Sequence, residues 1–202
     1  LPLHYEEAVT TLASYSQTLY PAWSQLLHET SDIDPEYQAC GMLVLPPFDT
    51  EAALDWCSAH QMPFEYPPLL QPPLESFHDE ALWLPQVAQV RNPRLLQALR
   101  HTVEQQRVNI VEHAEFLHWE IRHGKITGIL TTAGHHHAAN YIVTSGAWSP
   151  LLRQKLGSTP QLYPVRGQML LFQGEPNWLN TILFHQGVYI IPRQDGHILV
   201  GS

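Results

Sequence analysis

The sequence predicts a mixed fold, of the α+β or α/β class, built from helices and short strands. Three observations predict it: a long first segment with helical periodicity, alternating segments in the middle of the chain, and several short apolar segments towards its end. Hydrophobic residues make up 44% of the 202 residues and charged residues 14%, which is the composition of a globular protein with a buried core.

The first half of the chain alternates between helical and extended patterns. Leu12, Leu19 and Leu26 belong to a helical apolar pattern, Asp49 or Thr50 can cap a second helix, and Asn92 precedes Pro93 as an N-cap of a third. In order, we expect a helix over 4–29, a buried strand over 41–46, a helix over 49–57, an extended proline-rich connector over 61–73, an edge strand or irregular segment over 80–85, and a helix over 92–107.

The second half of the chain is dominated by strand patterns. Turn signals at Arg122–Lys125 and Ala133–His136 separate three alternating segments. We expect strands over 108–112, 115–122, 125–132 and 137–144, then a turn at Gly146–Trp148 into a helix, and strands over 162–172, 180–185, 187–193 and 196–201.

Composition argues against several classes of protein. The net charge is −9, and the ten Lys and Arg residues are scattered, which argues against a nucleic-acid partner. No apolar run reaches the ~18 residues that span a bilayer, and no signal-peptide pattern is present, so we expect no membrane association and a cytoplasmic location. Cys40 and Cys57 are predicted to be free thiols.

The 13 histidines do not predict a metal site. His135, His136 and His137 are consecutive, and neighbours on a strand point to opposite faces, so they are poorly placed to share one ion. His113 and His118 have only glutamates nearby as further ligands. No catalytic triad or phosphate-binding loop stands out either, so we expect no metal and name no acid–base residue.

Two segments in the second half carry the functional signal. Ser145-Gly-Ala-Trp148 lies where a strand is predicted to turn into a helix, and a glycine there permits close approach of a ligand to the backbone. Residues 189–201 predict a hairpin with its turn at 194–196. Its Tyr189 is either a core aromatic residue or a donor facing a ligand, whereas Arg193, near the turn, is expected at the surface.

The order and spacing of these motifs resemble the D-amino-acid oxidase and glycine oxidase family of FAD-dependent amine oxidases. The segments that carry the resemblance are Tyr141–Ser149, Tyr163–Gln168 and Tyr189–Ser202. Together with Tyr5–Tyr20, Cys40–Leu43 and Val90–Arg94, they look most like the bacterial glycine oxidases linked to thiamine synthesis. The resemblance implies an oxidoreductase that uses FAD and O2 to deaminate glycine or another small amino acid, giving glyoxylate or another 2-oxo acid, ammonia and H2O2.

The resemblance also implies site residues. Tyr189 matches a tyrosine that hydrogen-bonds the substrate carboxylate, and Phe116 matches a residue whose backbone contacts the adenine of FAD. Those enzymes generally have valine at the position of Phe116, but a backbone contact does not require a particular side chain. Four further residues are implied to contact the cofactor: Ser145, Gly146, Ala147 and Trp148. The role of Arg166, in Pro-Val-Arg-Gly-Gln, stays open; Gly167 beside it is expected to allow a bulge or close backbone approach.

The family's architecture implies a division of the chain into three parts. Residues 1–90 would begin a substrate-binding β-sheet domain, 91–157 would form the middle of a Rossmann-like FAD domain, and 158–202 would complete the substrate domain. The family's Gly-x-Gly-x-x-Gly motif and its substrate-pairing arginine have no counterpart in this sequence. We therefore expect a fragment that by itself binds FAD weakly and is catalytically silent.

Several alternatives remain open from the sequence. Sarcosine oxidase, D-amino-acid dehydrogenase and a tRNA-uridine-modifying flavoprotein share the Gly-Ala-Trp and Pro-x-Arg-Gly features, although the low content of basic residues counts against the tRNA enzyme. A non-catalytic binding module that kept the sheet and lost the cofactor is an alternative of a different class. Related oxidases are often tetramers, so the resemblance allows a homo-oligomer.

Overall fold

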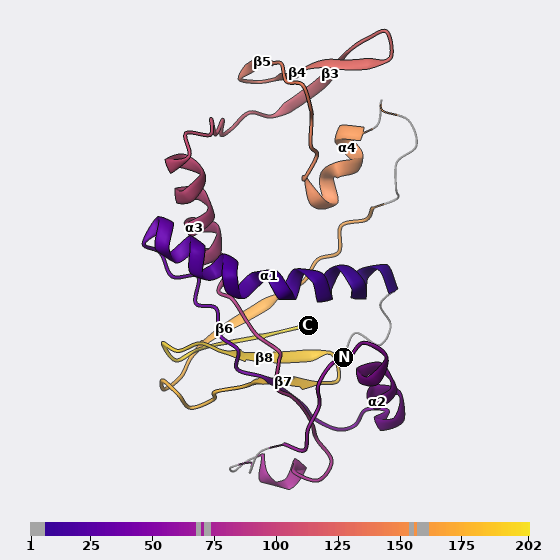
Figure 1. Ribbon diagram of the computed structural model, residues 1–202, viewed down its shortest axis with the longest axis vertical. Helices are drawn as coiled ribbons and strands as arrows, with labels where there is room; N and C mark the ends of the chain where they lie inside the picture. The colour runs from indigo at the N-terminus through magenta and orange to yellow at the C-terminus, as the bar shows by residue number, and fades with distance from the viewer. Residues whose placement is uncertain (1–6, 68–69, 71–73, 154–155, 157–161) are drawn as a thin grey trace. The chain divides into compact units, whose positions relative to one another are not determined.

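The computed structural model describes residues 7–67, 70, 74–153, 156 and 162–202, and these form two compact units (Figure 1). Residues 1–106 and 167–202 make the first unit, and residues 107–166 make the second. These boundaries differ from the predicted ones at 90 and 157, because the helix over 92–105 lies with the first unit and the chain up to residue 166 with the second. The mixed α and β class is confirmed.

The first unit is built on a six-stranded sheet in the order β2-β1-β7-β8-β9-β6. Only the β1–β7 pair is parallel, and the other neighbours are antiparallel. The strands are β1 (Met42–Val44), β2 (Leu82–Leu84), β6 (Met169–Gln173), β7 (Ile182–His185), β8 (Val188–Pro192) and β9 (His197–Gly201). The predicted edge position of β2 is confirmed, whereas the predicted strand over 162–172 begins only at Met169.

Helices α1 (Glu7–Ser31), α2 (Thr50–Ala59) and α3 (Asn92–Gln105) belong to this unit, with a short helix η1 (Glu75–Phe77). The predicted cap of α2 is confirmed, since the Asp49 carboxylate accepts a hydrogen bond from the Ala52 N–H at 3.0 Å. Asn92 was predicted to cap α3 but is its first residue, and Arg91 takes the N-cap position. Part of the proline-rich connector, residues 68–69 and 71–73, lies outside the described residues.

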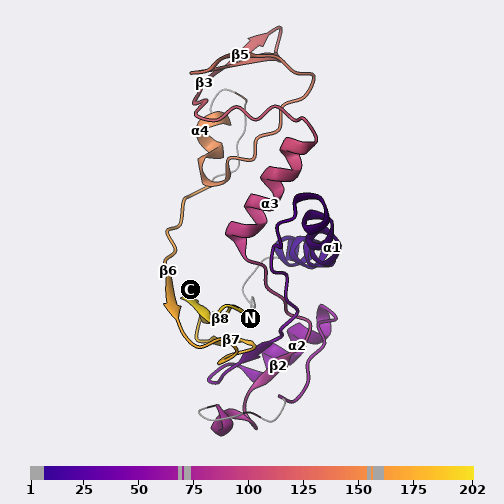
Figure 2. The same ribbon diagram turned by 90° about the vertical axis from the view of Figure 1, so that its left-hand side faces the viewer.

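Helix α1 packs against α3, as the two ribbon views show (Figures 1 and 2). Thr30 on α1 and Thr102 on α3 hydrogen-bond through their hydroxyls at 3.1 Å, and Leu27 and Ala98 are buried. The Gln17 side chain on α1 donates to the Gln86 carbonyl, just after β2, at 3.1 Å. Within the described residues, no helix is both long enough and apolar enough to cross a bilayer.

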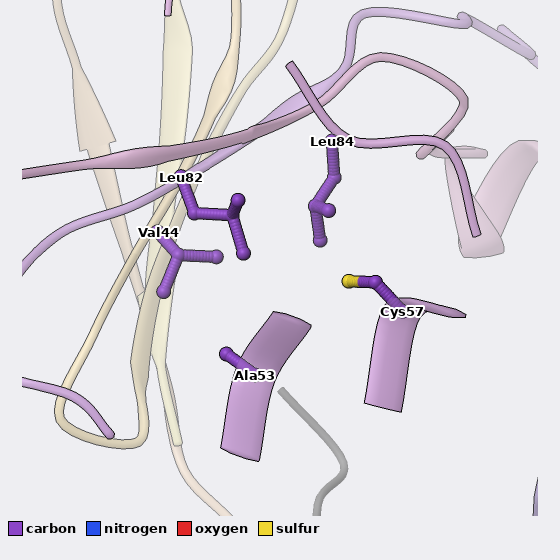
Figure 3. Close-up of a cluster of buried hydrophobic side chains, with 5 residues drawn as sticks. All are labelled: Val44, Ala53, Cys57, Leu82 and Leu84. Carbon is purple, nitrogen blue, oxygen red and sulfur yellow. The ribbon is translucent and has the colours of Figure 1, made fainter. Parts of the chain in front are cut away.

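Both faces of the sheet carry buried apolar clusters. On the face towards α2, Ala53 and Cys57 of the helix are fully buried beneath strand residues (Figure 3). Those strand residues are Val44, Leu82 and Leu84. On the opposite face, Leu43, Leu45 and Leu183 are buried together. Leucines with 1–2% exposure in such clusters contribute several kcal/mol of stability, about 2–5 per truncated side chain.

The second unit contains a three-stranded antiparallel sheet in the order β3-β4-β5. Its elements are β3 (Phe116–Arg122), β4 (Lys125–Thr131), β5 (Gly134–His136), the 3-10 turn η2 (Gly146–Trp148) and the short helix α4 (Ser149–Arg153). The predicted turn between β3 and β4 is confirmed, with His123 at φ 50° and Gly124 at φ 74°. These left-handed conformations match the twist of a tight hairpin.

Two predicted strands of this unit are wrong. Residues 108–112 are bracketed by left-handed residues, Arg107 at φ 58° and His113 at φ 56°, and form no strand. The third strand lies at 134–136 rather than 137–144. Side chains replace its ladder beyond that point: the His137 ring contacts the Thr127 carbonyl at 2.8 Å, and the Ala138 N–H donates to the Tyr141 hydroxyl at 2.9 Å.

We expect Leu84→Ala to lower the free energy of unfolding of the first unit by about 2–5 kcal/mol, because Leu84 is 1% exposed and truncation leaves a cavity beside Cys57. Denaturant unfolding of both variants measures the effect. The control is Leu96→Ala on α3, where the side chain is 65% exposed and a change below about 0.5 kcal/mol is expected. Equal losses in the two variants would contradict this account of the core.

Candidate functional site

The hairpin that carries Tyr189 is formed by β8 and β9, with its turn at the predicted position. Gly196 adopts φ 86° in this turn, and a side chain there would collide with the backbone of Gly174 to Pro176. Tyr189 itself lies near the start of β8, directly opposite Phe184 on β7 and Gly201 on β9. The structure therefore confirms the hairpin and its turn, and places the Tyr189 side chain on a defined face of the sheet.

Residues that lie directly opposite one another in neighbouring strands share one face of the sheet. The register places Tyr189 in a continuous row that crosses all six strands. The members, from β2 to β6, are Leu82, Val44, Phe184, Tyr189, Gly201 and Met169. Leu82 and Val44 are 6% and 2% exposed, Phe184 and Tyr189 are half-buried, Gly201 is buried, and Met169 on the edge strand is 47% exposed.

Tyr189 thus lies between the buried residues of β1 and β2 and the exposed edge strand β6. Its register continues the apolar face that begins at Val44, next to Phe184 on β7. An amphipathic aromatic residue suits this position because its ring is buried and its polar end stays available. This position allows either role for Tyr189, a core aromatic residue or a donor that faces a ligand.

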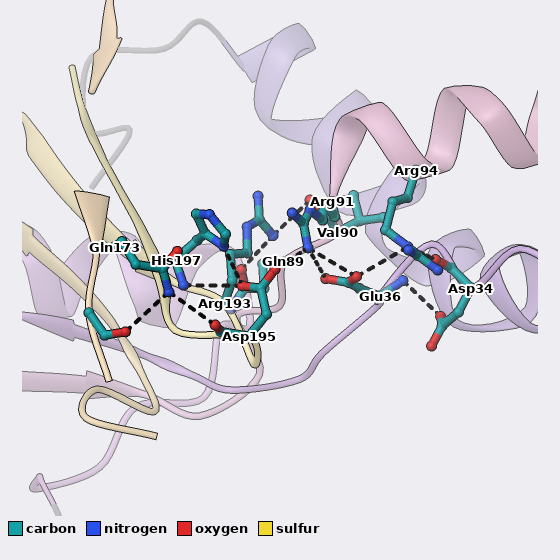
Figure 4. A network of polar contacts seen from close by, with 11 residues as sticks. Asp34, Glu36, Gln89, Val90, Arg91, Arg94, Gln173, Arg193, Asp195 and His197 are labelled. Carbon is teal, nitrogen blue, oxygen red and sulfur yellow. Dashed lines mark hydrogen bonds and ion pairs between the residues drawn. The ribbon is translucent and has the colours of Figure 1, made fainter. Parts of the chain in front are cut away.

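A polar network holds the turn end of the hairpin against the rest of the unit (Figure 4). At its centre is Gln89, which is 8% exposed. Its amide nitrogen donates to the Pro192 carbonyl at 2.8 Å, and its amide oxygen accepts from the Arg193 guanidinium at 2.7 Å. The same guanidinium donates to the Val90 carbonyl at 3.2 Å. One buried side chain therefore binds both the backbone and a charged group of the hairpin.

Arg193 is not the surface residue that the sequence predicted. Burial lowers the pKa of its guanidinium, and the positive charge of Arg91 lowers that pKa further, while Glu36 and Asp195 oppose the shift. The prediction was wrong because the position beside a turn indicates exposure only when no other segment covers the turn. Here the segment around Gln89, more than a hundred residues earlier in the chain, covers it.

Arg91 extends the network with two ion pairs. Its guanidinium lies 2.8 Å from the Asp195 carboxylate and 3.2 Å from the Glu36 carboxylate, and Arg94 contacts Glu36 at 3.1 Å. Burial alone would raise the pKa of Asp195, but the His197 backbone N–H, the Arg91 guanidinium and the His197 ring hold that pKa well below its ordinary value. The sequence contained no signal for this network, because its members come from three distant segments.

The other predicted contact residues lie in the second unit. Ser145 precedes η2, and its hydroxyl is 3.1 Å from that of Ser149. Gly146 adopts φ 55°, and the space beside its α-carbon is open. Ala147 is half-buried, and Trp148 is 66% exposed. No strand leads into this turn, and the helix that follows has five residues, so the predicted strand-to-helix junction is reduced to a turn.

A cavity of about 420 Å³ lies beside this turn. Its wall includes Trp119 and Ser145, and the other lining residues are Ile129, residues 140–144 and Leu152. Phe116 on β3 packs against Trp119 with ring centroids 5.2 Å apart, and Tyr141 meets Trp119 edge-on at 5.7 Å. The Trp119 indole N–H donates to the Leu152 carbonyl. Ser145 therefore lines the cavity directly, whereas Phe116 contacts Trp119 in its wall, a residue that the sequence did not single out.

A second cavity, of about 500 Å³, lies in the first unit between α1 and the β1–β2 edge of the sheet. Gln17 and Tyr20 of α1 face Met42 and Leu84 across it, and Trp56 of α2 closes one side. Its walls come from these elements rather than from the hairpin that carries Tyr189.

The remaining candidates are exposed or paired. Arg166 lies on an exposed segment without regular structure. His135 contacts the Glu120 carboxylate at 2.7 Å, and His137 lies 3.8 Å from the same carboxylate. Across the described ranges, no three or more His, Cys, Asp and Glu side chains are grouped so that they could hold a metal ion. Cys40 and Cys57 are free thiols, and burial raises the pKa of Cys57.

We expect Asp195→Asn to destabilise the protein at neutral pH, because the carboxylate with its lowered pKa stabilises the fold only while it is ionised. Its contribution is present above the ordinary pKa of 3.8 and is lost as the pH falls below it. The difference in unfolding free energy between the two proteins should be constant above about pH 5 and shrink below pH 4. Denaturant unfolding across this range measures it.

The control for this pH series is Asp79→Asn, whose side chain is 97% exposed in the wild type. Its stability should follow that of the wild type at every pH, since an exposed ion pair contributes little. A difference for Asp195→Asn that persists unchanged to pH 2 would mean that the charge of Asp195 does not hold the hairpin.

The chain is similar to known proteins in both sequence and fold. Residues 2–202 match the family model described as FAD dependent oxidoreductase. Glycine oxidases from Pseudomonas aeruginosa and Pseudomonas putida are each 35% identical over the whole chain, which spans 57% of their length. The crystal structure of glycine oxidase from Bacillus cereus aligns with 98% of this chain and 58% of its own, with a TM-score of 0.84 and 20% identity.

Proposed function

The chain belongs to the FAD dependent oxidoreductase family, and from this membership we propose that the protein oxidatively deaminates glycine or another small amino acid with FAD as its cofactor. The observation that carries the proposal is the position of Tyr189, between the buried and open parts of one sheet face. The 35% identity to two glycine oxidases over the whole chain supports glycine as the substrate.

In the proposed reaction, the substrate amine and its α-carbon lose two electrons and two protons to become an imine. FAD, when bound, would supply the two-electron oxidation of the α-carbon, with O2 as the final electron acceptor and H2O2 as its product. Water then adds to the imine and releases ammonia and glyoxylate, or the 2-oxo acid of a larger substrate. The protein's own residues bind the substrate and set its orientation; we assign no acid–base residue.

Tyr189 would bind the carboxylate of the substrate. Its phenol can donate one hydrogen bond to an anionic oxygen, and the apolar neighbours Phe184 and Val44 keep that side of the row dry. Hydrogen bonds to charged groups contribute about 1.5–3 kcal/mol, more than neutral ones. The polar network around Gln89 would keep β8, and with it Tyr189, fixed while the substrate binds.

The second unit would hold part of the FAD. The residues present fit such a group, because the open space beside Gly146 lets a ligand approach the backbone and the cavity next to Ser145 has an aromatic wall. Trp119, with Phe116 and Tyr141 packed on it, gives that wall a fixed position. We therefore propose that Phe116 and Ser145–Trp148 contact the cofactor, and that 107–166 belongs to the FAD domain and the rest to the substrate domain.

We expect Tyr189→Phe to raise the KM for glycine of the FAD-loaded protein about ten- to a hundredfold, through loss of one hydrogen bond to the carboxylate. A peroxide assay with glycine as substrate measures it. Tyr66→Phe is the matched control, since Tyr66 is 88% exposed in the same unit and should leave KM unchanged. An unchanged KM in Tyr189→Phe would remove Tyr189 from the substrate site.

For the cofactor, we expect Gly146→Ala to weaken FAD binding at least about tenfold, because a methyl group would stand where the ligand approaches the backbone. Quenching of FAD fluorescence on titration with protein measures it. Gly134→Ala is the control: Gly134 also has positive φ, at 116°, and open space around it in the same unit. Equal weakening in both variants would point to backbone strain rather than to a contact with FAD.

A further inference from the structure

Gly201 and Met169 occupy the two positions of the row that follow Tyr189. Gly201 lies directly opposite Tyr189 on one side and directly opposite Met169 on the other. Gly201 has no side chain, so the next side chain after the Tyr189 ring on this face is that of Met169, two strands away. Residue 201 itself therefore contributes no side chain to the row between Tyr189 and Met169.

The Met169 thioether fills the place that a side chain at position 201 would take. A Cβ at position 201 would collide with the Met169 sulfur and would lie 3.1 Å from its terminal methyl carbon. Gly201 is buried although the strand next to it is the exposed edge of the sheet, because Met169 covers it. On this face the Tyr189 ring is thus followed by a flexible, apolar thioether that covers Gly201.

We propose that Met169 is a specificity-determining residue that limits the size of the substrate side chain. The proposal rests on the proposed function, in which the Tyr189 hydroxyl binds the carboxylate. A substrate held there with the group on its α-carbon towards Gly201 would meet the Met169 thioether, which would have to move further for a larger group than for hydrogen or a methyl group. The site would therefore accept glycine and the smallest amino acids, and would exclude branched or aromatic ones.

The chemistry of the neighbouring groups agrees with this size limit. The ring of Tyr189, the thioether of Met169 and the backbone of Gly201 offer no charged partner to a charged substrate side chain. In hydrophobic pockets one methylene group changes the specificity ratio about 10- to 200-fold. Shortening Met169 should therefore change which substrate is preferred more than it changes the rate with glycine.

The first experiment compares kcat/KM for glycine and D-2-aminobutyrate in the FAD-loaded wild type, Met169→Ala and Leu170→Ala. We expect Met169→Ala to raise the ratio of D-2-aminobutyrate to glycine at least about tenfold. Leu170→Ala is the matched control, since Leu170 is the next residue on the same strand and is 60% exposed. Leu170 pairs with Val200, so its side chain lies on the other face of the sheet. A ratio that is unchanged in Met169→Ala, or raised equally in Leu170→Ala, overturns the proposal.

The second experiment does not depend on activity or on FAD. The chain has three methionines, so the ¹³C-methyl signal of Met169 is identified by its absence in Met169→Leu. We expect acetate to shift this signal in the wild type, and Tyr189→Phe to weaken the apparent acetate affinity about tenfold or more. In the wild type, the bulkier 3-methylbutyrate should bind at least about tenfold more weakly than acetate. In Met169→Ala, which lacks the Met169 signal, the two ligands should bind about equally well, and the Tyr189 ring signals report the binding.

The two experiments separate the two hypotheses. If acetate shifts no signal or binds Tyr189→Phe as well as wild type, the carboxylate site at Tyr189 is wrong, and the size limit that rests on it is overturned too. If acetate binding depends on Tyr189 but Met169→Ala discriminates against 3-methylbutyrate as strongly as wild type does, only the role of Met169 is overturned. Selective gain of the larger ligand in Met169→Ala supports both.

Discussion

The parallel pairing of β1 with β7 is the interaction on which the first unit depends. It joins segments about 140 residues apart, through hydrogen bonds from Ile182 and Thr181 to the Gly41 carbonyl and from Leu45 to the Phe184 carbonyl. Without it, the C-terminal antiparallel strands would have no link to the buried apolar face of β1 and β2. Antiparallel hairpins can form locally, whereas a parallel pair requires the chain to return over a long connection.

The backbone conformation of Gly41 also allows β1 to pack against its other neighbour, β2. It adopts φ 67°, and any side chain there would collide with the Trp83 indole of β2. Gly41 therefore contributes to the contacts of β1 with both neighbouring strands. Its carbonyl accepts hydrogen bonds from Ile182 and Thr181 at the start of β7, and its lack of a side chain allows the Trp83 indole of β2 to pack over it. The row from Leu82 to Met169, and with it the placement of Tyr189, follows from this local arrangement.

The polar network adds specificity to an alignment that apolar packing alone would leave loose. Hydrophobic contacts between β8 and its neighbours tolerate small shifts, but the Gln89 amide matches only one position of the Pro192 carbonyl and the Arg193 guanidinium. The ion pairs of Arg91 with Glu36 and Asp195 are partly exposed, so each contributes little to the free energy of folding. The register of the hairpin is set mainly by the hydrogen bonds of the buried Gln89 amide. A rigid hairpin is what a tyrosine needs if it is to orient a substrate.

The sequence by itself determined the elements whose signals are local. The apolar period of α1, the capping Asp49, the glycine turns at 124 and 196, and the β8–β9 hairpin were all predictable, because a helix, cap or tight turn depends on neighbouring residues. The motif order also identified the family. Only the tertiary structure decided the parallel β1–β7 pair, the burial of Arg193 by Gln89, the Trp119 wall, and the row that sets Met169 beyond Tyr189. These depend on contacts between distant segments, where an alternating pattern such as 108–112 or 137–144 predicts a strand but supplies no partner for it.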